Sequence, residues 1–258
     1  MKKNRLIKLM VIFFILSCYS SVFAGEEIRI ATEEWPPFEG EKYSHYGIIL
    51  HIISEVFNET GVKVKYGFFP WARSEHYVKE GDWHAAAICG KTEERKKYFY
   101  FSDDAVYTGE LVLFYHKDHP IVWTENIEDL KGLIIGLPGG SALTTPLKEA
   151  EEKGLVTYEK VGDLKMNFLK LLKKRIHAVD ANKTVALYTI QTQLSPEQRA
   201  KIGYTKPYAL WNYHLIFSRK LKENEKFLEI FNKGLHKMKK SGRYDEMWKA
   251  FYRGEYNP

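Results

Sequence analysis

The feature that most constrains the fold of this chain is an alternation of strand-like and helix-like segments along most of its length. Apolar strand patterns occur at 28–31 and 83–89, and between them apolar residues recur at helical spacing over 48–57. The alternation starts afresh at 133–137 and continues to a last strand pattern at 213–218. Alternating β and α units predict a parallel sheet covered by helices, that is, an α/β fold. No low-complexity linker interrupts the chain, so we expect two α/β units connected by strands.

Glycine and apolar spacing set the predicted helix boundaries. The segment 71–80 is predicted as a helix that stops at Gly81. A tight loop at Pro138-Gly139-Gly140-Ser141 precedes a predicted helix over 143–152. Apolar residues over 227–238, and again after Gly242, predict two closing helices.

The first 24 residues have the order of a secretory signal peptide. Four basic residues within 1–8 precede an apolar run at 9–16, which is too short to span a membrane. Small residues at 22–24 offer a cleavage site, so we expect the mature chain to begin at Gly25 and to be periplasmic. An alternative is a lipoprotein signal that would leave Cys18 lipidated.

The net charge of the whole chain suggests a basic protein, but its distribution does not. The chain has 39 Lys and Arg against 33 Asp and Glu, a formal charge of +6. Four of those bases lie in the predicted signal peptide, which contains no acid, so the mature chain would carry 35 bases and 33 acids, or +2. A nearly neutral chain gives little support for a nucleic-acid partner, and we expect none.

The cysteines and histidines give no sign of a metal site or of any cofactor. If Cys18 leaves with the signal peptide, Cys89 is alone and is predicted to be a small buried hydrophobic residue within 85–89. The nine histidines are scattered, without an H-E-x-x-H motif or a Cys/His cluster. No later apolar run reaches the ~18 residues that a membrane helix needs.

Three motifs occur in a recognisable order. Residues 28–38 read IRIATEEWPPF, residues 92–95 read TEER and are followed by FSD at 101–103, and residues 240–248 read KSGRYDEMW. Their order and spacing resemble the bacterial extracellular solute-binding proteins of family 3, the polar-amino-acid receptors of ABC importers. Asp104 stands where that family usually has proline.

The resemblance implies a type II periplasmic binding fold, in which two Rossmann-like lobes are joined by two crossover strands and the ligand lies between them. Lobe 1 would combine residues 25–106 with 210–258, and lobe 2 would hold residues 107–209. Ligand capture would then be a hinge closure.

The resemblance also assigns ligand contacts. Arg95 would hold a ligand carboxylate, for which the planar guanidinium fork is suited. The alternative for Arg95 is a cation on a solvated face beside Lys96 and Lys97. Gly140 and Ser141 would offer backbone and hydroxyl donors to the ligand; alternatively, they form only a strand-to-helix turn with Ser141 as the helix cap.

Aromatic residues would form the walls of the site. Trp35 falls where the family places an aromatic residue against the ligand, and Trp71 with Arg73 would form a second wall. The alternative for Trp71 is a core position. Glu33 matches an acidic position that can face the cleft, and its alternative is a surface charge beside Glu34.

Departures from the family pattern leave the ligand open. Gly90 replaces a usual Ser or Thr, and His51 replaces a common Asp. Asn182 replaces the Asp that pairs with a ligand ammonium; Asn can accept a hydrogen bond but brings no charge. Asp180, two residues earlier on a predicted strand, could substitute for it.

These residues favour a monomeric binding receptor that passes a small polar solute to an ABC permease in the inner membrane. The sequence shows no convincing catalytic group. Two other classes share the fold: a dehydratase-type enzyme, which would need a cleft acid such as Glu33 or Asp180, and a sensory module for a membrane kinase.

Overall fold

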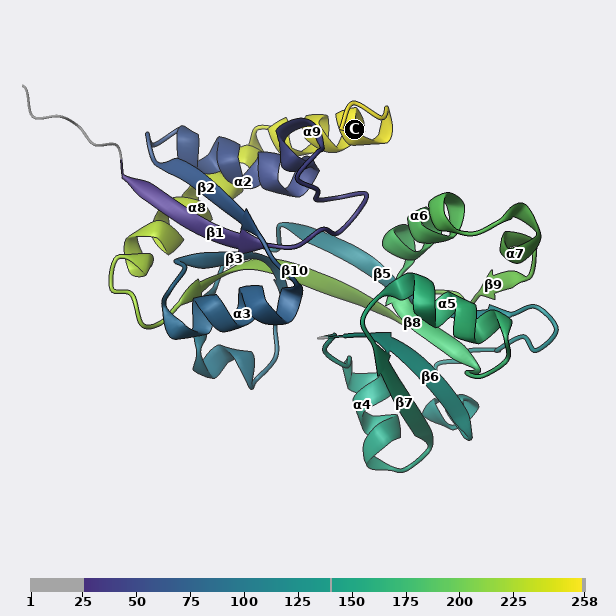
Figure 1. Cartoon of the computed structure of the whole chain (residues 1–258). Helices are drawn as coiled ribbons and strands as arrows, with labels where there is room; N and C mark the ends of the chain where they lie inside the picture. Colours follow the sequence, from purple (N-terminus) through teal and green to yellow (C-terminus); the bar gives the residue numbers. More distant parts are fainter. Residues whose placement is uncertain (1–25, 140, 257–258) are drawn as a thin grey trace, which may run out of the picture.

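The structure is a computed structural model that describes residues 26–139 and 141–256 (Figure 1). The expected signal peptide, including Cys18, lies outside the described residues, and so does Gly140. Within the described ranges no helix is both long and apolar enough to cross a membrane. The described strands join in one sheet that is flanked by helices, which makes an α/β fold.

The first part of the chain alternates parallel strands and helices. Its elements are β1 (Glu27–Thr32), α2 (Ile48–Asn58), β2 (Lys63–Phe68), α3 (Trp71–Glu80) and β3 (Ala85–Gly90). β1 lies between β2 and β3 and pairs with both in parallel. α3 ends at Gly81, whose left-handed φ of 86° glycine adopts without steric cost. The structure thus confirms the helix predicted over 71–80.

The second part repeats the alternation. Its elements are β5 (Tyr107–His116), β6 (Leu133–Pro138), α4 (Thr145–Glu152), β7 (Val156–Val161), α5 (Leu164–Leu172), β8 (Ala178–Asn182) and α6 (Lys183–Gln193). β6 pairs in parallel with β7 and β8. Short elements that the sequence patterns do not predict are β4 (Phe99–Phe101), α7 (Pro196–Ala200), β9 (Ile202–Tyr204) and the 3-10 turns η1 (Ser44–Tyr46), η2 (Arg95–Lys97) and η3 (Ile127–Leu130).

Two ten-residue strands, β5 and β10 (Ala209–Ser218), connect the halves. The main strand order is β2-β1-β3-β10-β5-β8-β6-β7, and β10 is antiparallel to both β3 and β5. The prediction of a parallel sheet is therefore wrong for these strands. The chain enters the second half on β5 and returns on β10, so the two strands run in opposite directions and need no crossover helix between them (Figure 1).

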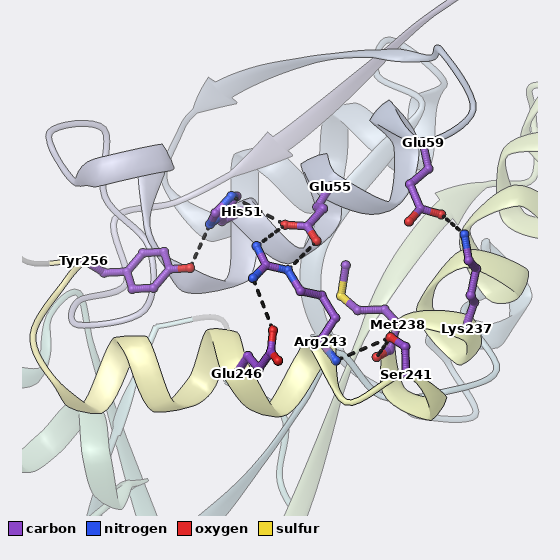
Figure 2. A network of polar contacts seen from close by, with 9 residues as sticks. All are labelled: His51, Glu55, Glu59, Lys237, Met238, Ser241, Arg243, Glu246 and Tyr256. Atoms are coloured by element: carbon purple, nitrogen blue, oxygen red, sulfur yellow. Dashed lines mark hydrogen bonds and ion pairs between the residues drawn. The ribbon is translucent and has the colours of Figure 1, made fainter.

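Two helices, α8 (Asn224–Lys240) and α9 (Arg243–Tyr252), return to the first half beside α2 (Figure 1). Phe57 of α2 stacks on Phe231 of α8 with ring centroids 5.6 Å apart. Figure 2 shows a polar network at the same junction. In it, Arg243 donates to both Glu55 carboxylate oxygens at 2.7 and 2.8 Å, while His51 Nδ1 lies 2.7 Å from Tyr256 Oη. His51, one of the departures from the family pattern, thus takes part in anchoring the C-terminal segment.

The second half has a core of its own. Val112 and Phe114 of β5 are buried against Phe168 and Leu171 of α5. Val185 of α6 instead joins the core of the first half, which shows that the two halves touch. The space between them is therefore bounded by packed elements on both sides.

Candidate ligand-binding site

A cavity of about 330 Å³ lies between the two halves and receives residues from both. Eight of the ten residues proposed from the sequence line it: Glu33, Trp35, Trp71, Gly90, Arg95, Ser141, Asp180 and Asn182. In the first half they come from the segment after β1, from α3, from β3 and from η2; in the second half they come from the loop after β6 and from β8. Gly140 lies outside the described residues, and Arg73 is described but does not line the cavity.

Arg73 is exposed because of helix geometry. Successive helix residues turn by about 100°, so Arg73 lies about 200° around α3 from Trp71. Glu75, four residues after Trp71, shares the Trp71 face instead. Trp71 therefore lines the cavity without Arg73, and the two residues do not form one wall.

Arg95 is held by Glu75. Its Nε donates to Glu75 Oε1 at 2.8 Å and its Nη2 to Glu75 Oε2 at 3.1 Å, while Nη1 donates to the Gly90 carbonyl at 3.3 Å. The guanidinium carbon also lies 5.6 Å from the ring centroid of Trp71. The Arg95 side chain is only 12% exposed, so the alternative of a solvated surface cation does not describe it.

An aromatic wall faces the cavity, and sequence reasoning found only part of it. Trp35 contacts Tyr213 with centroids 5.1 Å apart, and Tyr213 and Trp211 both line the cavity from β10. Residues two apart on a strand point to the same face, so the pattern Trp-x-Tyr at 211–213 was the available signal. It became informative only once β10 was known to lie beside β3.

Trp211 explains why residue 90 is glycine. A Cβ at Gly90 would lie 2.1 Å from Trp211 Nε1 and 2.4 Å from Cε2, so any side chain at residue 90 would force the indole to move. The serine or threonine usual at this position in the family is therefore incompatible with the present position of the Trp211 indole, which fills that space. Gly90 and Trp211 therefore depend on each other: the glycine leaves the space that the indole occupies.

Two of the lining carboxyls are perturbed by burial. Burial raises the pKa of Glu33 to about 7, although the backbone N–H of Trp71 partly offsets this. Burial likewise raises the pKa of Asp180 to about 6, and Tyr208 Oη donates to Asp180 Oδ1 at 2.6 Å. Both carboxyls line the cavity, and both change protonation closer to neutral pH than a solvent-exposed carboxyl does.

Of the two lining residues Asn182 and Ser141, only Asn182 caps a helix. Asn182 caps α6, where its Oδ1 accepts from the backbone nitrogens of Thr184 at 3.1 Å and Val185 at 3.3 Å. Ser141 does not cap α4, because the N-cap residue there is Thr144. The proposed capping role of Ser141 is therefore wrong, and Ser141 lines the cavity from a loop that begins at Pro138.

Sequence reasoning also missed a lining segment at 162–165, between β7 and α5. It brings Asp163 and Lys165 to the cavity, and Asp163 also caps α5 by accepting from the Met166 nitrogen at 2.7 Å. Among the described residues, no group of three or more His, Cys, Asp and Glu side chains is arranged to hold a metal ion.

Comparisons with known proteins agree with this fold. Residues 28–254 match the family described as bacterial extracellular solute-binding proteins, family 3. An ancestral arginine-binding protein bound to arginine is 25% identical at a TM-score of 0.69, with 86% of this chain and 96% of that one covered. No match was found among curated proteins.

Two further solved structures share the fold at lower identity. The substrate-binding protein of an amino acid ABC transporter is 21% identical at a TM-score of 0.69, covering 88% of this chain and 99% of that one. A histidine kinase sensor domain with similarity to periplasmic binding proteins is 15% identical at a TM-score of 0.71, covering 90% and 96%. The family match spans nearly the whole described chain. The chain therefore belongs to the bacterial extracellular solute-binding proteins of family 3.

Proposed function

We propose that this chain is a periplasmic receptor that binds a small polar ligand bearing a carboxylate, such as an amino acid, and delivers it to an ABC importer in the inner membrane. It acts as an exported monomer and without catalysis. Residues 25–106 with 210–258 form one lobe and residues 107–209 the other. Arg95 receives the ligand carboxylate, and the aromatic wall receives the rest of the ligand.

The observation that carries the proposal is a cavity with a buried guanidinium and side chains contributed by both halves. A site assembled from two bodies binds most tightly when they approach, so ligand binding and closure are coupled. β5 and β10 are the connections across which such a hinge would act. The volume of about 330 Å³ is at the small end of ligand pockets, which suits an amino-acid-sized molecule.

The test begins with a thermal-shift screen of amino acids, short peptides and small carboxylates, because a ligand that binds only the folded state raises its apparent stability. Calorimetry on the best ligand then compares variants. Replacing Arg95 alone would strand the half-buried Glu75 carboxylate, so the double variant Arg95→Gln/Glu75→Gln removes both charges together.

The double variant is expected to lose at least about tenfold in affinity, since hydrogen bonds to charged groups contribute about 1.5–3 kcal/mol. Arg73→Gln is the matched control, because Arg73 is exposed and outside the cavity. Its affinity should be that of the unmodified chain. Unimpaired binding by the double variant would reject Arg95 as the carboxylate contact.

A dehydratase is the second candidate, and it is favoured by one observation. A carboxyl with a pKa of about 7 in a cavity, as for Glu33, is suited to donate a proton at neutral pH. Incubation of the purified protein with a prephenate-like substrate tests it. Product formation that is lost in Glu33→Gln would favour the enzyme, and no turnover would leave binding alone.

A further inference from the structure

Glu39 is a buried carboxyl residue that does not line the cavity between the two halves. Its side chain is completely buried. Thr32 Oγ1 donates a hydrogen bond to Glu39 Oε2 at 2.6 Å, whereas Glu39 Oε1 has no hydrogen-bond partner among the described residues. A carboxylate has about four acceptor sites, so the charged form of this group would be poorly satisfied here.

The surroundings of Glu39 favour its neutral form. A carboxylate that is buried without a cation or enough hydrogen bonds is costly, so such a group takes up a proton instead. The described charged and titratable side chains that act on it are Glu33 and Glu34 after β1 and Tyr66 of β2, and none of them is a cation. Burial raises the pKa of Glu39 to about 8; the hydrogen bond from Thr32 lowers it, and the two neighbouring carboxyls raise it further. Glu39 is therefore mostly protonated at neutral pH.

Glu39 also closes the turn that carries Trp35. The Trp35 nitrogen donates to the Glu39 carbonyl at 3.1 Å, and the Glu39 nitrogen donates to the Trp35 carbonyl at 3.2 Å, so residues 35–39 form a closed turn. The Glu39 side chain fixes this turn to β1 through Thr32. Trp35 lines the cavity and its ring contacts Tyr213, so the position of the ring depends on where the turn is held.

The same threonine anchors the helix that carries Trp71. The Thr32 carbonyl accepts hydrogen bonds from Ser74 Oγ of α3 at 2.9 Å and from the Phe69 nitrogen at 2.8 Å. Both Thr32 and Ser74 are fully buried. Through Thr32, the Glu39 carboxyl is thus joined to two segments that supply cavity walls, the 35–39 turn and α3.

We propose that Glu39 is a positioning residue: its neutral carboxyl group, bonded to Thr32, holds the 35–39 turn on β1 and so keeps the Trp35 ring in the cavity wall. When the carboxyl releases its proton to solvent, the new charge is drawn toward water and the turn moves with it. The inference rests on the proposed function only in that Trp35 serves as a ligand contact. The binding site is therefore complete at neutral pH and loosens in alkaline solution.

Fluorine NMR of the protein labelled with 5-fluorotryptophan tests this without any ligand. The chain has six tryptophans, and Trp35→Phe identifies the Trp35 signal. All the proteins compared carry Glu33→Gln, because Glu33 lies close to Trp35 in the chain and itself has a pKa of about 7. In this background the Trp35 signal should shift between about pH 6 and about pH 9.5. Its midpoint should lie at or slightly below the pKa of about 8, since the charge of Glu33 no longer contributes.

Three variants show whether the Glu39 proton is responsible. Glu39→Gln keeps the shape of the neutral carboxyl but cannot ionise, so the Trp35 signal should keep its low-pH position throughout. Glu41→Gln is the matched control, because Glu41 is exposed in the same loop, and the shift should persist. Thr32→Val removes the hydrogen bond that lowers the pKa of Glu39, so the midpoint should rise. This variant keeps the test available if Glu39→Gln does not fold.

The outcomes separate this inference from the proposed function. A Trp35 signal that shifts in the same way with and without the Glu39 carboxyl would overturn the inference, and so would an unchanged midpoint in Thr32→Val. A constant Trp35 signal in the protein that retains Glu39 would show a merely structural residue and overturn it as well. These results need no ligand, so each of them leaves the receptor function intact. A titration as expected, together with no binding in the thermal-shift screen, would support the inference and reject the receptor function alone.

Discussion

The contact between Gly90 and Trp211 gives the sharpest prediction about how this cavity is built. In Gly90→Ala, the added Cβ would meet three indole atoms of Trp211 at 2.1, 2.4 and 2.5 Å, where real Cβ atoms do not come under 3.0 Å. The indole must therefore move, and β3 holds residue 90 in place through its pairing with β10. Because Trp211 lines the cavity, the displaced indole would move into the cavity.

The expected cost follows from the same distances. Forcing one extra methyl group into a packed site costs about 1–3 kcal/mol, and Trp211 is half-buried, so we expect about 1–2 kcal/mol of lost unfolding free energy. Ligand affinity should fall with it, because the ring leaves the wall and enters the ligand's space. Urea unfolding followed by circular dichroism measures the first effect and calorimetry the second.

A double-mutant cycle isolates the contact. In a Trp211→Ala background the ring is gone, so Gly90→Ala should cost nothing further, which gives a coupling energy of about 1–2 kcal/mol. Gly162→Ala is the matched glycine control: it also lines the cavity, but its Cβ would meet nothing within 4 Å. Costs of Gly90→Ala that are the same with and without Trp211 would refute the steric argument.

Three further predictions concern Glu33, Cys89 and the ion pair between Arg243 and Glu55. The pKa of Glu33 rises from 4.5 unfolded to about 7 folded, so the folded state holds the extra proton and stability falls as pH rises between these values. Glu33→Gln should flatten that slope by up to about 1.4 kcal/mol per pH unit in the free energies of unfolding obtained from urea titrations at pH 5 to 8; an unchanged slope would contradict it. Burial raises the pKa of Cys89 to about 12, so iodoacetamide should modify it only in denaturant, and rapid labelling of the native protein would be inconsistent with this environment. Arg243→Gln should cost no more than about 1 kcal/mol, because its pair with Glu55 is half exposed; a larger loss in unfolding free energy would show that the junction in Figure 2 depends on it.

Local patterns in the sequence were enough to predict individual helices and strands, but not which strands pair. The helix over 71–80 is predicted from its stop at Gly81, which is a local signal, and α3 has those bounds. The same helical spacing already separates Trp71 from Arg73 by about 200°, so their assignment to one wall was avoidable. In contrast, the antiparallel placement of β10 depends on which strands meet in space, which no local period records.

In the site, too, local motifs predict some residues, whereas others depend on contacts between distant segments. Arg95, Trp35 and Glu33 lie in motifs that the resemblance covers, and the structure brings them to the cavity. Glu75 lies 20 residues before Arg95 in a helix that reads as an ordinary polar surface, so nothing local marks it as the partner of a buried guanidinium. Pairings of this kind appear only after the helix is docked on the sheet.

The two departures from the family pattern now have different meanings for recognition. Gly90 removes a side-chain hydroxyl but admits an indole, so a polar contact is exchanged for an aromatic surface. Asn182 removes a charge, yet its oxygen is occupied in capping α6, so it offers the ligand no acceptor in place of the lost carboxylate. An acidic partner for a ligand ammonium would therefore have to come from neighbouring residues, and Asp180 and Glu33 are buried carboxyls that line the same cavity. In place of a hydroxyl at residue 90 the cavity has the Trp211 indole, and in place of a carboxylate at residue 182 it has the carboxyls of Asp180 and Glu33. For this reason, ligand specificity in this chain has to be inferred from the assembled cavity and not from the aligned positions.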